Sequence, residues 1–506
     1  MIAVRSVAQV RAAEEVAFTQ VPEGALMQRA AHALAITCAR LLDDAVGGVA
    51  GTRVVLLVGS GNNGGDALWA GQRLAGRGCR VDAITLSDRP HEEGARALVR
   101  AGGRVHRWTG DDDERGLLAD AHLVIDGILG IGGTGGLRPD AADVAESVAN
   151  SGALVVAVDV PSGVDADTGV VDGAAIAADV TVTFGAVKPG LLLAPGRFRA
   201  GTVSLIDIGL EFDGRPDAVV LAGIDVDRYV PEPVDADYKY SRGVVGISAG
   251  SAAYPGACLM ATGGARHGNA GMVRFLDRSD GAAAMVLDHF PDVVVDGAAP
   301  SDQPHVTAWG CGSGFTGDAT DVLTVRAVLS APVPVVLDAG ALTIVGESEE
   351  IRAVIAERAA RGLPTVLTPH QGEFERLLPG LLTDAPGRLD AARRGAQHLQ
   401  ASIVLKGAGT VVACPSGAAA IDTEGTADLG TAGSGDVLMG LLAALLAGAW
   451  ARGVREPDLL NEAMAAAVWL HGRAGRQAAE SGPVTALDVE AALKQAVLSA
   501  RFGDPA

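Results

Sequence analysis

Short apolar runs alternate with helical patterns along nearly the whole chain, and no other feature constrains its fold as strongly. In the first half, the apolar runs are 53–58, 80–86, 123–126, 154–158, 180–184 and 202–208. Helical patterns precede the first run at 6–20 and 24–44 and separate later ones. Alternation of this kind predicts a parallel sheet with helices on both faces.

The second half repeats the same alternation. It begins with an apolar run at 243–250, and its further strand candidates are 272–276, 293–296, 306–309, 333–338, 365–368 and 402–406. The glycine-punctuated segment 407–417 predicts a hairpin. We therefore predict an α/β fold for both halves.

A chain of 506 residues exceeds what one hydrophobic core usually organises, which predicts at least two domains. The acidic segment 229–237 contains two prolines and interrupts the alternation. We place the boundary just before it and predict domains at 1–225 and 226–506.

Composition restricts the class of protein. The net charge of −21 disfavours binding to nucleic acid or to an anionic membrane, and the apolar run 437–450 is too short to span a bilayer. The N-terminal sequence has no apolar signal core, and the five cysteines show no CxxC spacing. We expect a cytoplasmic homo-oligomer that acts on small molecules.

The loop 59–66 reads GSGNNGGD and lies between an apolar run and a helical pattern. Clustered glycines before a helix allow backbone amides to approach a phosphate. The letters also satisfy the GxGxxG dinucleotide fingerprint, with the acidic Asp88 at a suitable distance. Bulky Asn62 and Asn63, and a carboxylate at Asp66 that would repel phosphate, argue against that interpretation.

Polar residues follow three of the apolar runs of the first half: Asn63, Asp126, and the pair Asp159 and Ser162. Carboxyl ends of parallel strands line the ligand crevice, so these side chains should converge. Amide, carboxylate and hydroxyl oxygens suit a hard monovalent or divalent cation. The alternative is that each aspartate only caps a helix or turn. A second glycine-rich loop, 130–136, lies between them.

Lysine is rare in this chain. The four lysines are Lys188, Lys239, Lys406 and Lys494, whereas arginine supplies the other positive charges. An ammonium differs from a guanidinium fork, so the three lysines beside glycine or tyrosine are candidate site residues. Chance retention on a surface loop is the alternative for each.

The segment 430–436, GTAGSGD, opens an apolar helix. Amides at a helix N-terminus can hold a transferring phosphoryl group, and the helix dipole favours Asp436 as an ionised carboxylate. Such a carboxylate can accept the proton of an attacking hydroxyl. A capped core helix is the alternative, but it does not explain the nearby KGAGT segment 406–410.

Residues 1–215 resemble the NAD(P)H-hydrate epimerase domain, through GNNGGD, DGILG, DVPSGVDADTG and the segment 184–201. The resemblance implies a Rossmann-like fold and hydrated NAD(P)H as ligand. It implies contacts from Asn62, Asn63, Gly64, Gly65, Asp66, Gly130, Ile131, Gly132, Gly133, Thr134, Gly135, Gly136 and Asp159. By the same resemblance, Asp159 is catalytic and K+ is held by Asn63, Asp126 and Ser162.

Residues 226–500 resemble the ADP-dependent NAD(P)H-hydrate dehydratase, a ribokinase-like fold. The matching segments are 238–251, 254–261, 368–378, 406–412 and 431–440. The resemblance implies that ADP or AMP is bound by Lys406, Gly407, Ala408, Gly409, Thr410 and Gly435. It implies that the hydrate contacts Ala270, Gly314, His370 and Asp436, with Asp436 as the catalytic base.

Together the two resemblances imply a bifunctional repair enzyme that epimerises hydrated NADH or NADPH and dehydrates the S form with ADP. We expect Mg2+ on the nucleotide phosphates. Two alternatives stay open: a Rossmann oxidoreductase fused to a ribokinase-like small-molecule kinase, and a non-catalytic nucleotide sensor.

Overall fold

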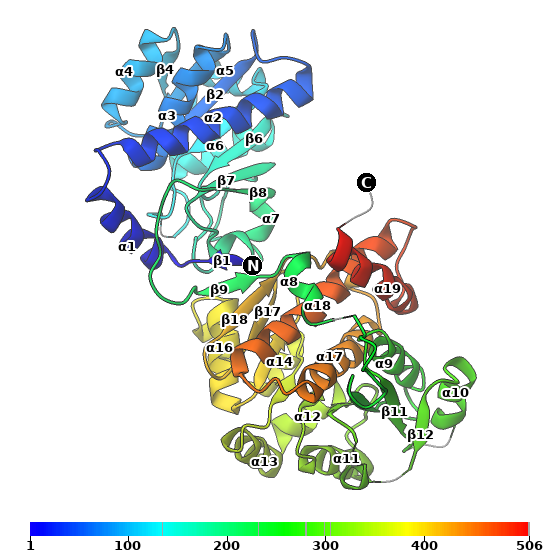
Figure 1. Ribbon diagram of the computed structural model, residues 1–506. Coiled ribbons are helices and arrows are strands. Elements are labelled where there is room, and N and C mark those ends of the chain that lie inside the picture. Colours follow the sequence, from blue (N-terminus) through cyan, green and yellow to red (C-terminus); the bar gives the residue numbers. More distant parts are fainter. Residues whose placement is uncertain (134, 231, 279–280, 298, 304, 504–506) are drawn as a thin grey trace. The chain divides into compact units, whose positions relative to one another are not determined.

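The chain divides into two units between Asp217 and Ala218 (Figure 1). This computed structural model describes residues 1–503 apart from 134, 231, 279–280, 298 and 304. One unit is Ala3–Asp217, and the other joins Met1–Ile2 to Ala218–Ala506. The division precedes the boundary predicted between residues 225 and 226, because strand β9 (Ala218–Val220) pairs with β18 of the second unit's sheet.

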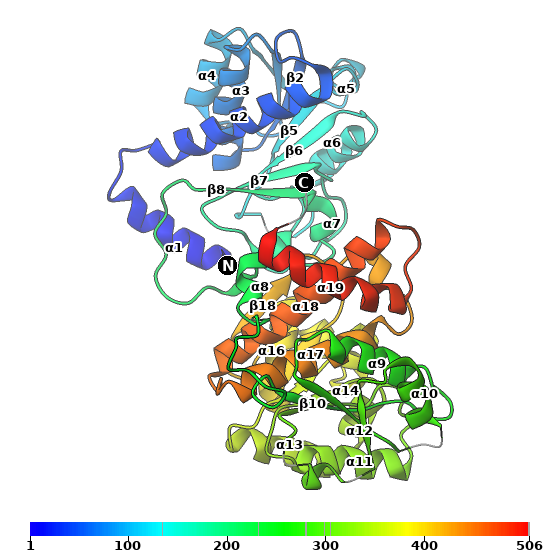
Figure 2. The same ribbon diagram turned by 45° about the vertical axis from the view of Figure 1, so that its right-hand side comes forward.

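The first unit, Ala3–Asp217, is built on a seven-stranded parallel sheet in the order β4-β3-β2-β5-β6-β7-β8. Figure 2 shows β5 to β8 side by side. Its strands are β2 (Arg53–Val58), β3 (Arg80–Thr85), β4 (Arg104–Arg107), β5 (Leu123–Gly127), β6 (Leu154–Val158), β7 (Val180–Phe184) and β8 (Thr202–Ile206). Its helices are α1 (Val7–Phe18), α2 (Ala25–Val46), α3 (Asn62–Ala75), α4 (Glu92–Arg100), α5 (Asp112–Ala119), α6 (Pro139–Ala149), η1 (Pro189–Leu191) and α7 (Arg197–Ala200).

Alternating residues of the same strands fill two separate cores in this unit. Val54 and Leu56 of β2 pack with α2, α3 and α4, whereas Val55 and Leu57 pack with α5 and α6. A strand buried on both faces carries apolar residues at every position, which is why β2 reads as a continuous apolar run. The three-layer α/β/α arrangement predicted for this half is therefore confirmed.

The second unit contains a larger mixed sheet in the order β1-β9-β18-β17-β16-β15-β14-β13-β10-β11-β12. The further strands are β1 (Ile2–Val4), β10 (Val244–Ser248), β11 (Met272–Leu276), β12 (Val294–Asp296), β13 (Ala308–Cys311), β14 (Val335–Leu337), β15 (Thr365–Leu367), β16 (Ser402–Leu405), β17 (Thr410–Ala413) and β18 (Ala419–Asp422). The antiparallel pair β16 and β17 is the hairpin that the glycines at 407 and 409 predicted.

Helices cover both faces of this sheet. They are α8 (Gly223–Asp227), α9 (Ala257–Arg266), α10 (Ala282–His289), η2 (Pro300–Asp302), α11 (Ala319–Ser330), α12 (Gly340–Glu347), α13 (Glu349–Ala360), α14 (Gln371–Leu377), α15 (Leu381–Asp384), α16 (Arg388–Leu399), η3 (Ala427–Leu429), α17 (Ser434–Ala451), α18 (Pro457–Ala479) and α19 (Ala486–Phe502). Helices α9, α17, α18 and α19 share one apolar core, while α11, α13 and α16 contact the sheet as well. The predicted α/β class is confirmed here too.

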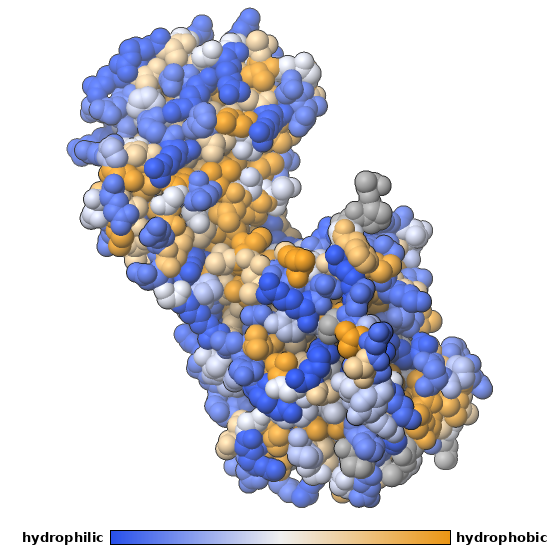
Figure 3. Space-filling model, in the orientation of Figure 1, coloured by the Kyte–Doolittle hydropathy of each residue, from blue (hydrophilic) through white to orange (hydrophobic). Residues whose placement is uncertain are grey.

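Helix α17 is the one helix among the described residues whose length and composition would allow it to cross a membrane. Most of it is buried inside the second unit, which is typical of the core helix of a globular domain. On the visible face of the molecule, hydrophobic side chains form separate patches among hydrophilic ones (Figure 3). Exposed large apolar residues such as Phe18, Phe198 and Ile224 come from different elements.

Candidate active sites

The loop between β2 and α3 brings backbone atoms closer than side chains would allow. A Cβ atom at Gly59 would lie 1.9 Å from the Ile128 carbonyl oxygen, and one at Gly64 would lie 2.4 Å from the Gly59 carbonyl oxygen. No side chain caps the first turn of α3, whose N-cap is Gly61. The exposed Asn62 begins this turn, and its free amides form the kind of helix terminus that binds anions.

Asn63, Asp126 and Ser162 lie together at the carboxyl edge of the first sheet, as the strand-end argument predicted. Asp126 accepts hydrogen bonds from the Ser162 amide at 2.8 Å and from its hydroxyl at 2.6 Å. The Ser162 Oγ accepts from the Leu129 amide at 2.9 Å. Asn63 Nδ2 donates to the carbonyl oxygens of Leu129 at 3.1 Å and Val158 at 2.6 Å. Three side chains from three strand ends thus share one hydrogen-bond network.

The Asp126 carboxyl is fully buried. Burial raises its pKa to about 6, because a low-dielectric environment disfavours the charged form, although hydrogen bonds from Ser162 and the Ile128 amide act in the opposite direction. A cation bound beside this carboxylate would favour its ionised form. The oxygen donors of Asn63, Asp126 and Ser162 therefore fit a hard cation such as K+ in chemistry and in charge.

Asp159 lies directly after β6 and pairs with a buried lysine. The Lys188 Nζ donates to Asp159 Oδ1 at 2.5 Å, and it also donates to the Thr183 hydroxyl at 3.0 Å and the Phe184 carbonyl at 2.9 Å. The Thr183 hydroxyl and the Phe184 amide donate to the same Asp159 oxygen. Asp159 has a φ of 66°, a left-handed conformation that aspartate tolerates at some cost in energy. The ion pair thus fixes a strained carboxylate at this edge of the sheet.

The charge of Asp159 acts on two further carboxyl groups, those of Asp66 and Glu14. Asp66, in the first two turns of α3, is only 6% exposed, and Glu14 of α1 is half-buried. Burial is the main cause that raises the pKa of each, and the Asp159 charge raises both further. Lys188 and Arg11 act in the opposite direction on Glu14. Sequence reasoning missed Glu14, because α1 precedes the sheet and its motif signal is no stronger than that of an ordinary amphipathic helix.

The glycine loop 130–136 approaches both α1 and the Asn63 side chain. A Cβ atom at Gly130 would lie 2.3 Å from Asn63 Oδ1, and one at Gly136 would lie 2.2 Å from the Asp172 carbonyl oxygen. Arg11 donates to the Ile131 carbonyl at 3.3 Å. The described members of the predicted set, which are Gly130, Ile131, Gly132, Gly133, Gly135 and Gly136, thus border the same edge of the sheet. Thr134 lies outside the described residues.

In the second unit, Asp436 occupies the first turn of α17. Gly433 is the N-cap of this helix with a φ of 91°, a left-handed conformation that glycine adopts without penalty. The buried His471 donates from Nε2 to the Ser434 carbonyl at 2.8 Å, and burial lowers the pKa of His471 to about 4. A neutral histidine therefore anchors the start of the helix. Gly435 lies at the centre of the site, where a Cβ atom would be 3.3 Å from Lys406 Nζ.

Asp338 accepts hydrogen bonds from three side chains of the second site. It follows β14, and its Oδ1 accepts from the Thr368 hydroxyl at 2.6 Å and from Lys406 Nζ at 2.9 Å. Its Oδ2 accepts from the Ser313 hydroxyl at 3.5 Å. These residues follow β13, β14, β15 and β16, four neighbouring parallel strands, so the carboxyl edge of the sheet gathers them beside Asp436.

The pKa of the Asp436 carboxyl depends on its burial and on the neighbouring charges of Asp338 and Lys406. Burial and, secondly, the Asp338 charge raise its pKa to about 6, although a hydrogen bond from Ser313 and the Lys406 charge act in the opposite direction. Burial lowers the pKa of Lys406, but Asp338 and Glu373 outweigh this effect, so its pKa is raised. Asp436 is thus a carboxyl group that changes charge close to neutral pH beside a lysine that stays cationic.

His370 and the KGAGT segment lie on adjacent loops. The His370 Nδ1 caps α14 by accepting from the Gly372 amide at 3.0 Å, and Glu373 accepts from the His370 amide at 2.8 Å. Glu373 also lies 3.8 Å from Lys406 Nζ. In 406–410, Gly407 and Gly409 have left-handed φ angles, Ala408 is half-buried, and the Thr410 hydroxyl donates to the Gly407 carbonyl at 3.0 Å.

One predicted residue is misplaced. Ala270 immediately precedes β11, so it lies at the amino edge of the parallel strands, opposite to the edge that carries Asp338 and Lys406. The segment 267–272, HGNAGM, resembles the family pattern only loosely, and its position before a strand separates it from the site. Gly314 instead contacts Ala257, the first residue of α9, where their Cβ positions would be 2.8 Å apart. Ala257 lies in the YPGA segment, a signal that could have identified it.

Asp338, Ser313 and Thr368 were also not selected from the sequence. Asp338 ends the apolar run 333–338 in the same way that Asp126 ends its own run, so the strand-end argument of the first half could have found it. Ser313 and Thr368 carry no such signal, because hydroxyl residues after strands are common in turns.

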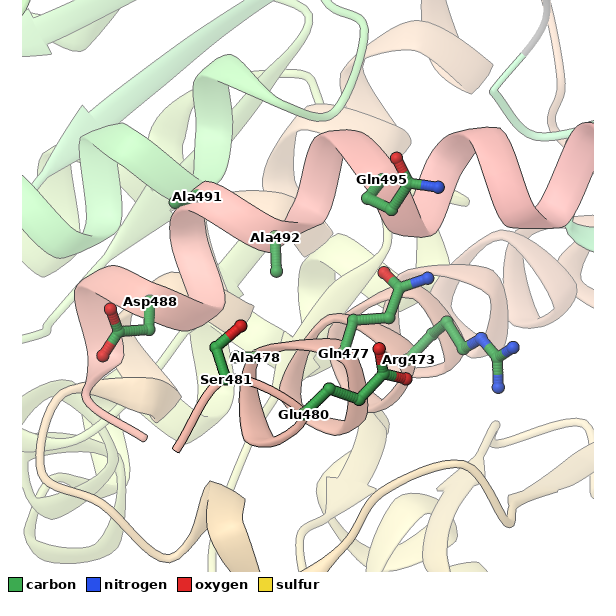
Figure 4. Close-up of a pocket in the computed structure, with 9 residues that line it drawn as sticks. All are labelled: Arg473, Gln477, Ala478, Glu480, Ser481, Asp488, Ala491, Ala492 and Gln495. Carbon is green, nitrogen blue, oxygen red and sulfur yellow. The ribbon is translucent and has the colours of Figure 1, made fainter. Parts of the chain in front are cut away.

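A hollow of about 740 Å³ opens between α18 and α19 (Figure 4). Arg473, Gln477, Glu480 and Asp488 line it and supply charges of both signs. None of its lining residues belongs to the cluster around Asp338 and Asp436, so it is not part of the candidate site.

Both sheets therefore carry carboxylates and a lysine at their carboxyl edges, each beside the amino end of a helix. This arrangement is typical of α/β enzymes that bind phosphate-bearing ligands.

Comparisons with known proteins agree with this class. A family model described as the YjeF-related protein N-terminus matches residues 23–190, and one described as NAD(P)H-hydrate dehydratase matches residues 245–495. The chain is 43% identical to the bifunctional NAD(P)H-hydrate repair enzyme Nnr of Mycobacterium leprae, over 87% of this chain and 88% of that protein. It is 36% identical to the corresponding enzyme of Gloeobacter violaceus, over 96% and 95%. The chain belongs to the family of bifunctional NAD(P)H-hydrate repair enzymes.

Among solved structures, the ADP/ATP-dependent NAD(P)H-hydrate dehydratase of Bacillus subtilis, co-crystallised with ATP and Mg2+, is 25% identical to this chain. The match covers 56% of this chain and 99% of that protein, with a TM-score of 0.47.

Proposed function

We propose that this protein repairs NADH and NADPH that have added water across the nicotinamide C5=C6 bond. The first unit interconverts the R and S epimers at C6, and the second dehydrates the S epimer at the expense of ADP. Membership of the repair-enzyme family supports both activities. The observation that carries the dehydratase assignment is Asp436, a half-buried carboxyl at the amino end of α17 beside Lys406 and Asp338.

In the dehydratase step, Asp436 accepts the proton of the C6 hydroxyl while that oxygen attacks the terminal phosphorus of ADP. The bond from this phosphorus to the bridging oxygen breaks, and AMP leaves. Phosphate then departs from C6 with its bonding electrons, C5 loses a proton, and the ring double bond returns. Phosphorylation is needed because hydroxide is a poor leaving group.

The nucleotide is assigned to Lys406, Gly407, Ala408, Gly409, Thr410 and Gly435. Amides of the Gly433–Gly435 turn and the Lys406 ammonium provide positive charge where negative charge develops on the transferring group. His370, Gly314, Ala257 and Asp436 are assigned to the hydrate. Mg2+ would neutralise the charge of the nucleotide phosphates.

In the first unit, the α3 amides from Asn62 to Gly65 and the loop 130–136 are assigned to the hydrate phosphates. Asp159 is assigned to the reacting ring, beside Asp66. K+ would be held by Asn63, Asp126 and Ser162, where it would fix the loop that follows β5 and supply positive charge near the pyrophosphate. Their oxygen atoms and the buried Asp126 carboxyl support this ligand set.

Family membership argues against the two alternatives, an oxidoreductase fused to a kinase and a non-catalytic sensor. The homo-oligomeric state, the cytoplasmic location and the lack of nucleic-acid or membrane partners stay predictions.

The test is turnover by the purified full-length protein. Incubation with the S hydrate, ADP, Mg2+ and K+ should restore the absorbance of reduced nicotinamide, and omission of ADP should abolish the recovery. The proposal fails if neither ADP nor ATP supports recovery of either epimer.

A further inference from the structure

Asp66 is a buried carboxyl group, and the charged groups that act on it are themselves acidic. It is 6% exposed, and its Oδ1 atom is buried without a hydrogen-bond partner among the described residues. A carboxylate held this way would lose the solvation of Oδ1 without a hydrogen bond in return, whereas a neutral carboxylic acid avoids most of that cost. Asp66 also follows directly on the glycines assigned to phosphate, where a negative charge would repel the ligand.

Two charged groups from other parts of the first unit act on Asp66. Asp159 and Glu14 are acidic and act on it directly, and both raise its pKa in addition to the main effect of burial. Lys188, the cation of this cluster, is engaged by Asp159 at 2.5 Å. His91 lies against the neighbouring Gly65, where a Cβ atom would be 3.3 Å from its ring. Asp159 is thus ion-paired, and Asp66 has no cation of its own among the described residues.

We propose that Asp66 is the general acid of the epimerase reaction, and that Asp159 is its general base. This inference rests on the proposed function of the first unit. It assigns opposite proton states to two neighbouring carboxyl groups, which is how enzymes divide acid and base roles between like residues. Asp159, which is ion-paired with Lys188, is ionised and accepts a proton. Asp66, which has no such partner among the described residues, is protonated and donates one.

The step that this pair performs is the opening of a hemiaminal. C6 of the hydrate carries a hydroxyl group and is bonded to ring nitrogen N1. Asp159 removes the hydroxyl proton, the oxygen forms a C=O bond, and the C6–N1 bond breaks. Its electron pair stays on N1, which takes the proton of Asp66.

Reclosure completes the exchange of configuration. Rotation about C5–C6 presents the other face of the aldehyde to N1. Asp66 takes back the N1 proton as nitrogen attacks, and Asp159 returns its proton to the oxygen. The net change is the configuration at C6, with both carboxyl groups restored and no other reactant consumed.

The test isolates epimerisation by omitting ADP. Full-length protein is mixed with one pure epimer, and the approach to the R and S mixture is followed by chromatography, with the rate in the absence of protein subtracted. Asp66→Asn keeps the shape of the side chain but cannot donate the proton. We expect kcat for interconversion to fall by about 100-fold or more, the range of general acid catalysis, with KM changed by less than about threefold.

Two controls separate this role from a structural one. ADP-dependent dehydration of the S epimer by the same variant should match wild type, because that site lies in the other unit. Asp66→Glu keeps an ionisable acid and should recover more activity than Asp66→Asn, with a rate that falls as pH rises.

Failure of the role proposed for Asp66 can be distinguished from failure of the proposed epimerase function. Interconversion by Asp66→Asn at close to the wild-type rate overturns the inference, and so does an effect confined to KM or an equal loss in both variants. Failure of the wild-type protein to interconvert the epimers would instead overturn the proposed function of the first unit.

Discussion

Asp436 and Asp338 lie in one cluster but differ in what holds them. Asp338 accepts hydrogen bonds from Thr368 and Lys406, whereas burial and the Asp338 charge raise the pKa of Asp436 to about 6. A base whose pKa lies near the working pH combines a large ionised fraction with adequate basicity. Asp338 is therefore the residue that holds Lys406, and Asp436 is the residue free to exchange a proton.

The pH dependence of dehydration follows from this assignment. Asp436 must be ionised to accept a proton, so kcat/KM for the S epimer should be constant above pH 6 and fall about tenfold per pH unit below it. At pH values well above 6, Asp436→Asn should lower kcat/KM by about 10²-fold or more, and the variant should lose this pH dependence. A profile that stays flat down to pH 4.5 would contradict this role.

The cation site gives a second prediction at the residue scale. Replacement of K+ by the larger tetramethylammonium ion should slow epimerisation and leave ADP-dependent dehydration unchanged. Ser162→Ala removes one oxygen donor and one hydrogen bond to Asp126, so it should raise the K+ concentration needed for half-maximal epimerisation. The matched control Ser147→Ala removes a hydroxyl from α6, outside the site. Equal responses of the two variants would contradict the assignment.

Asp66 gives a third prediction, which concerns stability. Its pKa is raised in the folded protein, so between its unfolded pKa, about 3.9, and its folded pKa the folded state binds more protons than the unfolded state. Stability from this group is therefore present at low pH and is lost as pH rises through that window. Asp66→Asn should lose less thermal stability between pH 4 and pH 8 than wild type does. An identical pH dependence would contradict the raised pKa.

At the scale of elements, close contact between α9 and α17 positions Asp436. A Cβ atom at Gly440 of α17 would lie 1.9 Å from the Ala261 carbonyl oxygen, and one at Gly264 of α9 would lie 2.1 Å from the Val437 carbonyl oxygen. Backbone cannot yield as a flexible side chain can, so any larger residue must push the two helices apart.

Gly440→Ala should therefore destabilise the second unit by about 1–3 kcal/mol and reduce dehydration, because it displaces the helix that carries Asp436. Gly116→Ala in α5 is the matched control, since a Cβ atom there meets nothing within 4 Å. It should stabilise its helix by about 0.5–1 kcal/mol. Thermal unfolding and dehydration rates measure both. A Gly440→Ala protein as stable and active as wild type would contradict the packing argument.

Some strands of the two sheets could be predicted from the sequence, and others could not. Periodicity identified the buried strands such as β2 and β14, because strands covered on both faces are apolar at every position. It missed β4, an edge strand of sequence Arg-Val-His-Arg, and β9, whose three residues pair only once the sheet has assembled.

Some residues of the two candidate sites could also be predicted from the sequence, and others could not. Residues at the carboxyl ends of buried strands, such as Asp126 and Lys406, could be placed because strand direction fixes which edge they share. Ala270 was misplaced because it was selected from a loose resemblance in sequence, which does not show that the residue precedes its strand. Glu14 could not be found, because its approach to Asp159 depends on where α1 packs and not on any local pattern.

At the scale of the whole molecule, two units with separate sheets carry two separate sites. The R epimer is not a substrate of the dehydratase in this account, so it is repaired only after conversion by the first unit. Substitutions in the first unit should therefore change the fate of the R epimer alone, whereas substitutions in the second unit should change the fate of both epimers.

The most direct test compares wild type, Asp159→Asn and Asp436→Asn on each pure epimer with ADP, Mg2+ and K+, following recovery of the reduced-nicotinamide absorbance. We predict that Asp436→Asn loses recovery of both epimers, whereas Asp159→Asn recovers the S epimer at the wild-type rate and the R epimer slowly. Equal loss of both epimers in Asp159→Asn, or recovery of the R epimer by Asp159→Asn as fast as wild type, would contradict the division of the reaction between the two units.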